Sequence, residues 1–103
     1  MIDIHMHIVK LWGGRDDLKG KALMKAMDRR GVDRFVLLPS GVSPEVPCFY
    51  FGPEDVLKEY RKFPDRIIPF CDVDPRSGQN SPDTDFSWIL GYYREAGARG
   101  LGE

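Results

Sequence analysis

Short apolar segments begin near positions 2, 34, 67 and 99 of this 103-residue chain, a spacing of about 32 residues. Each of the first three is followed by a segment whose apolar residues recur at helical spacing. A strand and a helix that repeat at this length form a βα unit, and successive right-handed crossovers produce a parallel sheet. The sequence therefore predicts an α/β fold of parallel βα repeats. Eight such units make a (β/α)₈ barrel of about 250 residues, so residues 1–103 would be its N-terminal three and a half units, a partial barrel domain.

The expected helices have recognisable ends. The first, of roughly 14 residues, begins near Asp16 and Asp17, which favour a helix start, and stops at Gly31. Its apolar stripe consists of Leu18, Ala22, Leu23, Ala26 and Met27. The second begins with a proline at position 53 and closes before Pro64, and the third is stopped by Gly97.

The expected strands differ in character. The segment 34–38 is a continuous apolar run, which is typical of a central parallel strand that is buried on both faces. The segment 66–73 is a third strand, although Pro69 cannot donate a ladder hydrogen bond. The segment from Arg99 is the first part of a fourth strand.

Composition excludes several classes of protein. A net charge of −1 provides no basic patch for nucleic acid. No apolar run approaches the 18 residues of a membrane span, and no signal sequence precedes the first strand. Two cysteines without a framework spacing favour reduced thiols. We therefore expect a cytoplasmic protein with no membrane association and with no indication of a nucleic-acid partner.

The first strand carries the only two histidines of the chain. Apolar Ile2, Ile4, Met6 and Ile8 alternate strictly with Asp3, His5 and His7, which predicts one apolar and one polar face. Side chains two residues apart in a strand lie roughly 6.5–7 Å apart at the backbone, and imidazoles at this spacing can lean onto one metal ion. The alternative is that two histidines lie by chance on an ordinary solvent-exposed strand face. We interpret the pair as metal ligands.

Three motifs together resemble the metal-dependent hydrolases of the amidohydrolase superfamily, particularly the amidohydrolase-2 group and the TatD-type enzymes. They are the opening Asp3-x-His5-x-His7, the strand ending at residues 70–75, and the segment 97–103, which ends in Glu103. The resemblance implies that His5 and His7 bind one divalent metal, with zinc as the default, and that Glu103 bridges a second. It also implies hydrolysis of an amide, ester, lactone or phosphoester by metal-activated water. The family's further ligands come from later strands, so the chain looks like an N-terminal fragment that is inactive alone.

Four further residues are candidates for contacts with the ligands or with a small-molecule substrate. Asp3 is either a hydrogen-bond partner of the histidines or a polar group satisfied elsewhere. Asp72 and Asp74 end the third strand, where a turn is the favoured interpretation. Trp12 would line a pocket or cover the barrel end.

Competing functions remain open at this stage. A decarboxylase of the aminocarboxymuconate-semialdehyde type shares the fold and the opening motif. The polymerase-and-histidinol-phosphatase group has a similar opening, but its downstream Ser-Asp-Gly is missing here. The alternative of a different class is a non-catalytic α/β module, whose open sheet edges would favour a homo-oligomer.

Overall fold

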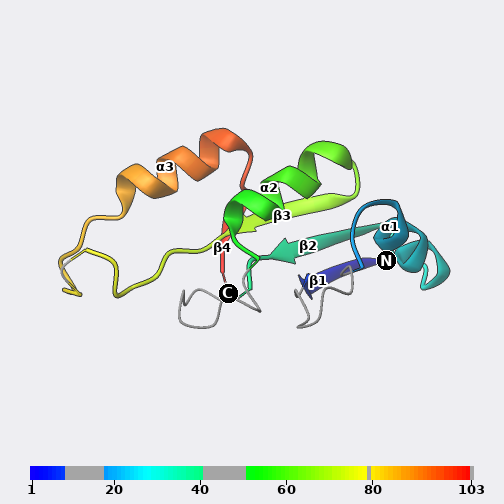
Figure 1. The fold of residues 1–103 in the computed structure, drawn as a ribbon, viewed down its shortest axis with the longest axis horizontal. Helices are drawn as coiled ribbons and strands as arrows, with labels where there is room; N and C mark the ends of the chain where they lie inside the picture. Colours follow the sequence, from blue (N-terminus) through cyan, green and yellow to red (C-terminus); the bar gives the residue numbers. More distant parts are fainter. Residues whose placement is uncertain (9–17, 41–50, 79, 103) are drawn as a thin grey trace.

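The computed structural model describes residues 1–8, 18–40, 51–78 and 80–102. Strands and helices alternate along the chain (Figure 1). Their bounds are β1 Ile2–His7, α1 Gly20–Arg29, β2 Arg34–Leu38, α2 Pro53–Lys62, β3 Ile67–Cys71, α3 Ser87–Ala96 and β4 Gly100–Leu101.

The described strands form one parallel sheet in the order β1-β2-β3-β4. Sequential order with parallel pairing requires a crossover after each strand, and α1, α2 and α3 lie in these crossovers. The predicted α/β fold of parallel βα repeats is therefore confirmed. β2 has the predicted bounds, and its residues 35–38 are all buried, as a central strand requires.

One apolar cluster fills the space between the sheet and the first two helices. The strands β2 and β3 contribute to this cluster the side chains on the face that α1 and α2 cover. Both helices contribute the side chains of their apolar stripes. Its most buried members are Phe35, Leu37, Val56 and Ile67. Since α1 and α2 share one cluster, both helices lie on the same face of the sheet.

The first helix begins later than the sequence predicts. α1 starts at Gly20, Lys19 has an extended backbone, and Leu18 lies outside the helix with half of its surface exposed. The predicted start at Asp16 and Asp17 lies outside the described residues. The observed start follows from a tertiary contact, because the backbone N–H of Gly20 donates to Glu59 Oε2 at 3.1 Å. A buried carboxylate on α2 thus satisfies one of the orphan N–H groups of α1.

The other predicted helix ends are confirmed. Pro53 occupies the first turn of α2, and the Asp55 carboxylate accepts a hydrogen bond from the Gly52 backbone N–H at 3.2 Å. Gly31 and Gly97 have φ angles of +69° and +117°, conformations that residues other than glycine rarely adopt. Gly97 directly follows the end of α3 and Gly31 comes two residues after the end of α1, and each reverses the chain toward the next strand.

Pro69 lies inside β3, paired with Leu37 of β2. The Pro69 carbonyl accepts a hydrogen bond from the backbone N–H of Arg99 at 2.7 Å. The backbone nitrogen and carbonyl of Pro69 therefore face the start of β4. Because β4 begins only at Gly100, the missing N–H of Pro69 removes no bond between the strands. The shortness of β4 therefore explains how a proline is accommodated in a central strand.

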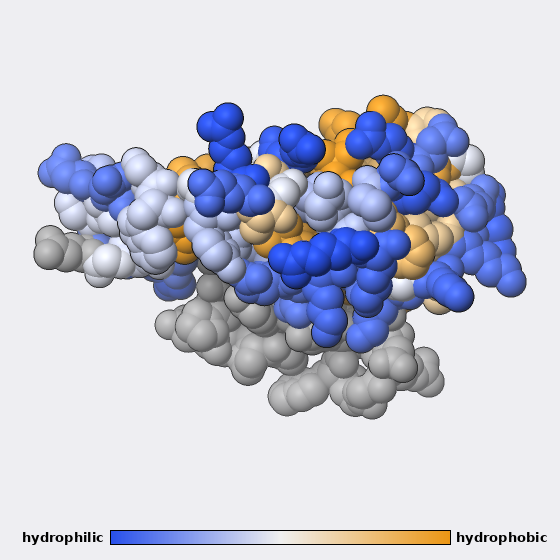
Figure 2. Space-filling model, turned by 90° about the horizontal axis from the view of Figure 1, so that it is seen from above, coloured by the Kyte–Doolittle hydropathy of each residue, from blue (hydrophilic) through white to orange (hydrophobic). Residues whose placement is uncertain are grey.

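The third helix is less deeply packed than the first two. Among residues Ser87–Ala96 none is buried, and Trp88 and Tyr92 are 75% and 55% exposed. Figure 2, viewed from the side that carries α2 and α3, shows apolar side chains at the surface among charged ones. A hollow of about 380 Å³ lies beside this helix, lined by Cys71, Leu90, Arg94, Ala98, Arg99, Gly100 and Leu101.

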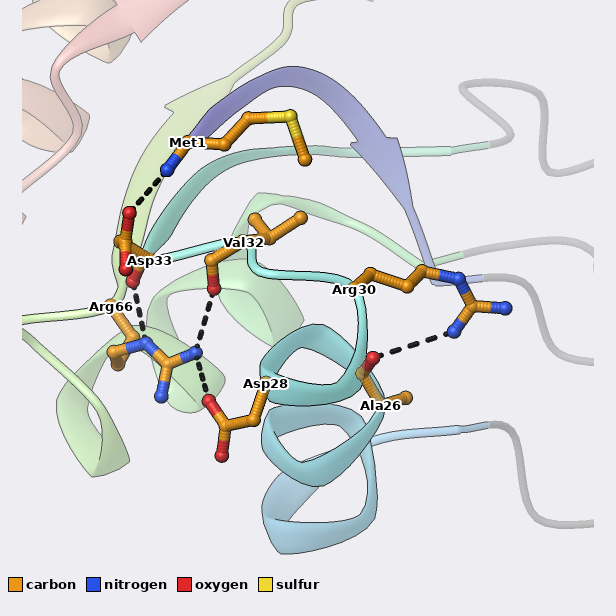
Figure 3. Close-up of polar contacts among 7 residues, drawn as sticks. All are labelled: Met1, Ala26, Asp28, Arg30, Val32, Asp33 and Arg66. Atoms are coloured by element: carbon orange, nitrogen blue, oxygen red, sulfur yellow. Dashed lines mark hydrogen bonds and ion pairs between the residues drawn. The ribbon is translucent and has the colours of Figure 1, made fainter.

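Arg66 joins the amino ends of the first three strands (Figure 3). Its Nε donates to the Asp33 carbonyl at 2.6 Å, and its Nη2 donates to the Val32 carbonyl at 3.0 Å. Nη2 also pairs with the Asp28 carboxylate at 2.8 Å, at the end of α1. The amino group of Met1 in turn forms an ion pair with Asp33. This end of the sheet is thus closed by structural polar contacts, which leaves the opposite end for a site.

Candidate functional site at the carboxyl ends of the strands

The carboxyl ends of the parallel strands lie together, at the end of the sheet where barrel enzymes place their active sites. His7 ends β1, Ser40 follows β2, and Asp72 and Asp74 follow β3. Ser40 holds two of these ends in place, because its hydroxyl donates to the Ile8 carbonyl at 3.0 Å. Sequence reasoning missed this role of Ser40, for which its place two residues after a strand was the available signal.

The structure brings His5 and His7 together. Their Nε2 atoms are 3.0 Å apart, and their rings meet edge to face with centroids at 4.9 Å. Two nitrogens that bind one tetrahedral zinc, each at about 2.0–2.1 Å, lie about 3.3 Å apart. The two nitrogens thus lie at hydrogen-bond distance, about 0.3 Å closer than in a chelating pair, so a small outward shift of the rings would make room for a shared divalent ion.

The remaining nitrogen of His7 shows what the pair lacks. His7 Nδ1 is buried, and it has no hydrogen-bond partner among the residues that the structure describes. A metal-bound imidazole ordinarily donates its other N–H to a carboxylate, a carbonyl or water. Across the described parts of the chain, no group of three His, Cys, Asp or Glu residues forms a metal site. The described residues thus bring two imidazoles together and place no third candidate ligand beside them.

Asp3 binds backbone rather than imidazole. Its Oδ1 accepts a hydrogen bond from the backbone N–H of His5 at 3.0 Å. The pairing of β1 also shifts here, because Asp3 is opposite Phe35 whereas Met6 is opposite Leu37. An advance of three residues along β1 thus corresponds to two residues along β2, which is the signature of a β-bulge. The predicted strict alternation of apolar and polar side chains along β1 is therefore wrong. The irregularity lies directly at the residues that bring His5 next to His7.

The bulge also changes the predicted apolar face of β1. Ile8 is buried and Met6 is partly buried against the core cluster, as expected. Ile2 and Ile4, however, are 55% and 77% exposed. Among the described residues, nothing covers these two side chains of the edge strand β1.

Asp72 and Asp74 occupy different environments. Asp74 forms an ion pair with Arg76 at 3.0 Å, and its Oδ1 accepts the Arg76 backbone N–H at 2.8 Å. These bonds to Arg76 hold the pKa of Asp74 below its ordinary value, and they confirm the turn interpretation for this residue. Burial raises the pKa of Asp72, and the charge of Asp74 raises it further against a lowering backbone hydrogen bond. Asp72 is therefore the carboxyl group at this end that holds a proton more readily.

Two predicted site residues, Trp12 and Glu103, lie outside the described residues. The most buried charged group that sequence reasoning missed is Glu59, which is 4% exposed. It pairs with Lys62 Nζ at 2.6 Å and binds the start of α1, so its role is structural. The spacing of Glu59 and Lys62, three residues apart on a helix, was the only signal for it.

Comparison with known proteins gives one likeness in fold. No family model matches the chain, and no curated protein matches it in sequence. The fold is similar to that of a probable 2-pyrone-4,6-dicarboxylic acid hydrolase from Acinetobacter baumannii, solved with citric acid bound, with a TM-score of 0.57 and 17% identity. The match covers 97% of this chain and 36% of the other, which is a (β/α)₈ barrel enzyme. The chain thus has the fold of a barrel sector and spans about a third of that structure's length.

No helix among the described residues combines the length and the apolar character needed to cross a membrane.

Proposed function

We propose that this chain belongs to a metal-dependent hydrolase of the amidohydrolase type, in which His5 and His7 bind a divalent ion. The observation that carries the proposal is the 3.0 Å separation of the two Nε2 atoms at the carboxyl end of a barrel-type sheet. Zinc is the ion we expect, and manganese or iron would also suit this ligand type. A bound ion would supply Lewis-acid activation of water and of the substrate carbonyl.

Asp72 is the residue we assign to proton transfer. It follows β3, two strands from β1, so its backbone lies about 10 Å from that of His7 at the usual strand spacing. A small substrate held between the two positions would contact both. Because burial raises its pKa, Asp72 is suited to carry a proton to or from a substrate oxygen.

The substrate class we infer is a small ester or lactone that carries carboxylates. The enzyme with the similar fold is named for hydrolysis of a pyrone dicarboxylic acid, and its crystal contained citric acid. Amides and phosphoesters are the other bonds that metal-activated water cleaves in such sites. Among the described residues His5 and His7 are the two candidate ligands, whereas a catalytic zinc has about three protein ligands. We therefore expect little or no turnover from residues 1–103 by themselves.

Cobalt substitution tests this function without requiring turnover. Cobalt(II) bound by the wild-type chain should give visible absorption that changes when acetohydroxamate, a mimic of a hydrated carbonyl, is added. The His5→Ala/His7→Ala variant should show neither signal. Asp72→Asn should bind cobalt equally well but respond more weakly to a lactone dicarboxylate. A cobalt spectrum that changes with neither acetohydroxamate nor the lactone dicarboxylate would contradict the proposed hydrolase function and indicate a non-catalytic metal-binding module.

Activity of the isolated chain is measured in parallel. Ester and lactone cleavage by the wild type should not exceed that of the metal ion alone. Cleavage above this control that disappears in His5→Ala would show that the chain is a sufficient catalyst, against our expectation.

A further inference from the structure

The two imidazoles of the His5–His7 pair are held by different contacts. His7 lies in the regular part of β1, where the strand is paired with β2. The next residue, Ile8, is buried in the core, and its carbonyl accepts a hydrogen bond from the Ser40 hydroxyl at 3.0 Å. His5 lies in the bulge instead, where it has no partner residue in β2. The position of His5 therefore depends on a contact other than regular strand pairing.

The contact that holds His5 is a carboxylate on the same strand. Asp3 Oδ1 accepts the backbone N–H of His5 at 3.0 Å, two residues along the chain. An Asp side chain that binds the N–H two residues on forms an Asx-turn, which is a local alternative to strand pairing. A bulge leaves a residue of its strand unpaired, and the N–H of that residue needs another acceptor. Because Asp3 supplies this acceptor, its carboxylate stabilises the bulged form of β1 over a regular one.

The bulge accounts for the direction of the His5 ring. In a regular strand, side chains two residues apart stand side by side, roughly 6.5–7 Å apart at the backbone. A bulge bends its strand and re-aims a side chain, and bulges are over-represented beside active sites. The rings of His5 and His7 do not stand side by side, because their planes meet at 71° and their Nε2 atoms are 3.0 Å apart. The convergence of the two rings thus occurs at the point where the strand is bulged.

We propose that Asp3 is a positioning residue for this pair: its carboxylate holds the bulge of β1, and the bulge turns the imidazole of His5 onto that of His7. The consequence for metal affinity rests on the proposed function, whereas the arrangement of the two rings does not. Because Asp3 acts through the backbone of His5, it needs an acceptor oxygen at the right distance and no charge. Asparagine should therefore replace it. Glutamate, which keeps the charge on a longer side chain, should fail as alanine does.

Nuclear magnetic resonance of the metal-free chain tests the arrangement of the rings. In the wild type and in Asp3→Asn, the ring protons of His5 and His7 should show a mutual nuclear Overhauser effect. Asp3→Ala and Asp3→Glu should lose this ring-to-ring signal, because the bulge is no longer held. Asp85→Ala is the matched control: Asp85 Oδ1 accepts the backbone N–H of Ser87 at 2.8 Å, the same bond across two residues but at the start of α3. It should keep the signal, and circular dichroism verifies that each variant is folded.

Zinc affinity tests the consequence for metal binding. In competition with a chromophoric chelator, Asp3→Ala and Asp3→Glu should have a dissociation constant for zinc about fivefold to thirtyfold above that of the wild type, because fewer molecules present a converged pair. Asp3→Asn and Asp85→Ala should stay within about twofold of the wild type.

The two measurements separate this proposal from the proposed function. A ring-to-ring signal that persists in Asp3→Ala or Asp3→Glu would overturn the positioning role of Asp3, as would its absence from the wild type or its loss in Asp3→Asn. Unchanged zinc affinity in Asp3→Ala would overturn the consequence for the metal site. A wild-type chain that binds no zinc would contradict the proposed function, and the signal between the rings would still decide whether Asp3 positions His5.

Discussion

The side chains at the two ends of the sheet differ in character: those at the amino end stabilise the fold, and those at the carboxyl end are suited to a functional site. At the amino end, Arg66 donates to two carbonyls and one carboxylate, and its planar guanidinium can reach all three at once. At the carboxyl end, His7 Nδ1 is buried with no partner in the described parts of the chain, and burial raises the pKa of Asp72. Fully satisfied polar groups stabilise a fold, whereas unsatisfied ones are characteristic of functional sites.

Replacement of Arg66 by lysine should lower the free energy of unfolding by about 1–2 kcal/mol, because an ammonium cannot reproduce the fork of bonds to Val32 and Asp33. The Asp28 carboxylate is mostly exposed, so its ion pair contributes the smaller part. Urea denaturation measures the change. Arg30→Lys is the matched control, since Arg30 makes a single long bond of 3.4 Å to Ala26, and its effect should stay within about 0.5 kcal/mol. Equal losses in the two variants would contradict the assigned role of Arg66.

Asp72 and Asp74 should have opposite effects on the pH dependence of stability. The folded state raises the pKa of Asp72, so this carboxyl favours folding below its unfolded pKa of about 3.9 and loses that advantage as pH rises through the folded pKa. Asp72→Asn should therefore stabilise the chain at neutral pH, and the gain should vanish in acid.

Asp74 is the control, because its effect on the pH dependence of stability should have the opposite sign. Its pKa is lowered by Arg76, so its contribution is present above the unfolded pKa and is lost as pH falls through the folded pKa. Asp74→Asn should destabilise the chain at neutral pH and have no effect in acid. Urea denaturation at both pH values compares the variants. The same sign for both substitutions would show that these environments are wrongly assigned.

At the scale of the elements, glycines on β4 make room for an aromatic ring from β3. Gly100 is paired with Phe70, and a Cβ built on Gly100 would lie 2.4 Å from Phe70 Cζ. Gly102 faces the same ring and Leu38 of β2 at 3.4 Å. The pattern Gly100-Leu101-Gly102 therefore serves close packing of β4 under Phe70, whatever its role in the site.

Gly100→Ala should destabilise the chain by about 1–3 kcal/mol, the cost of displacing a packed side chain. Gly91→Ala on α3 is the matched control: no atom lies within 4 Å of its added Cβ, and helix propensity favours alanine by up to about 1 kcal/mol. Thermal denaturation distinguishes the two. In a Phe70→Leu background the cost of Gly100→Ala should shrink, and an unchanged cost would show that the ring is not the cause.

The ends of the elements were predictable where local chemistry sets them. Pro53 starts α2, and Gly31 and Gly97 follow helix ends, because each residue's own backbone preference suits its position. The start of α1 was not predictable, since it depends on Glu59, which lies 39 residues away in the sequence. The bulge in β1 likewise depends on pairing with β2, and a single strand's alternation contains no information about it.

At the scale of the whole molecule, the 32-residue repeat was sufficient to predict a parallel sheet in sequential order. The site was predictable only in part. The approach of His5 and His7 followed from their spacing, whereas the different environments of Asp72 and Asp74 depend on burial and on Arg76. Spacing alone could not predict a third ligand, and Glu103, the residue that the resemblance implied for this role, lies outside the described residues.

Zinc content is the most direct test of the central claim that His5 and His7 are metal ligands. Plasma mass spectrometry of the purified chain should find near-stoichiometric zinc, and the His5→Ala/His7→Ala variant should contain none. Asp3→Asn serves as the control, because Asp3 binds backbone, and it should retain zinc. Zinc that persists in the double variant, or a wild-type chain that takes up none from a zinc-supplemented buffer, would contradict the metal site.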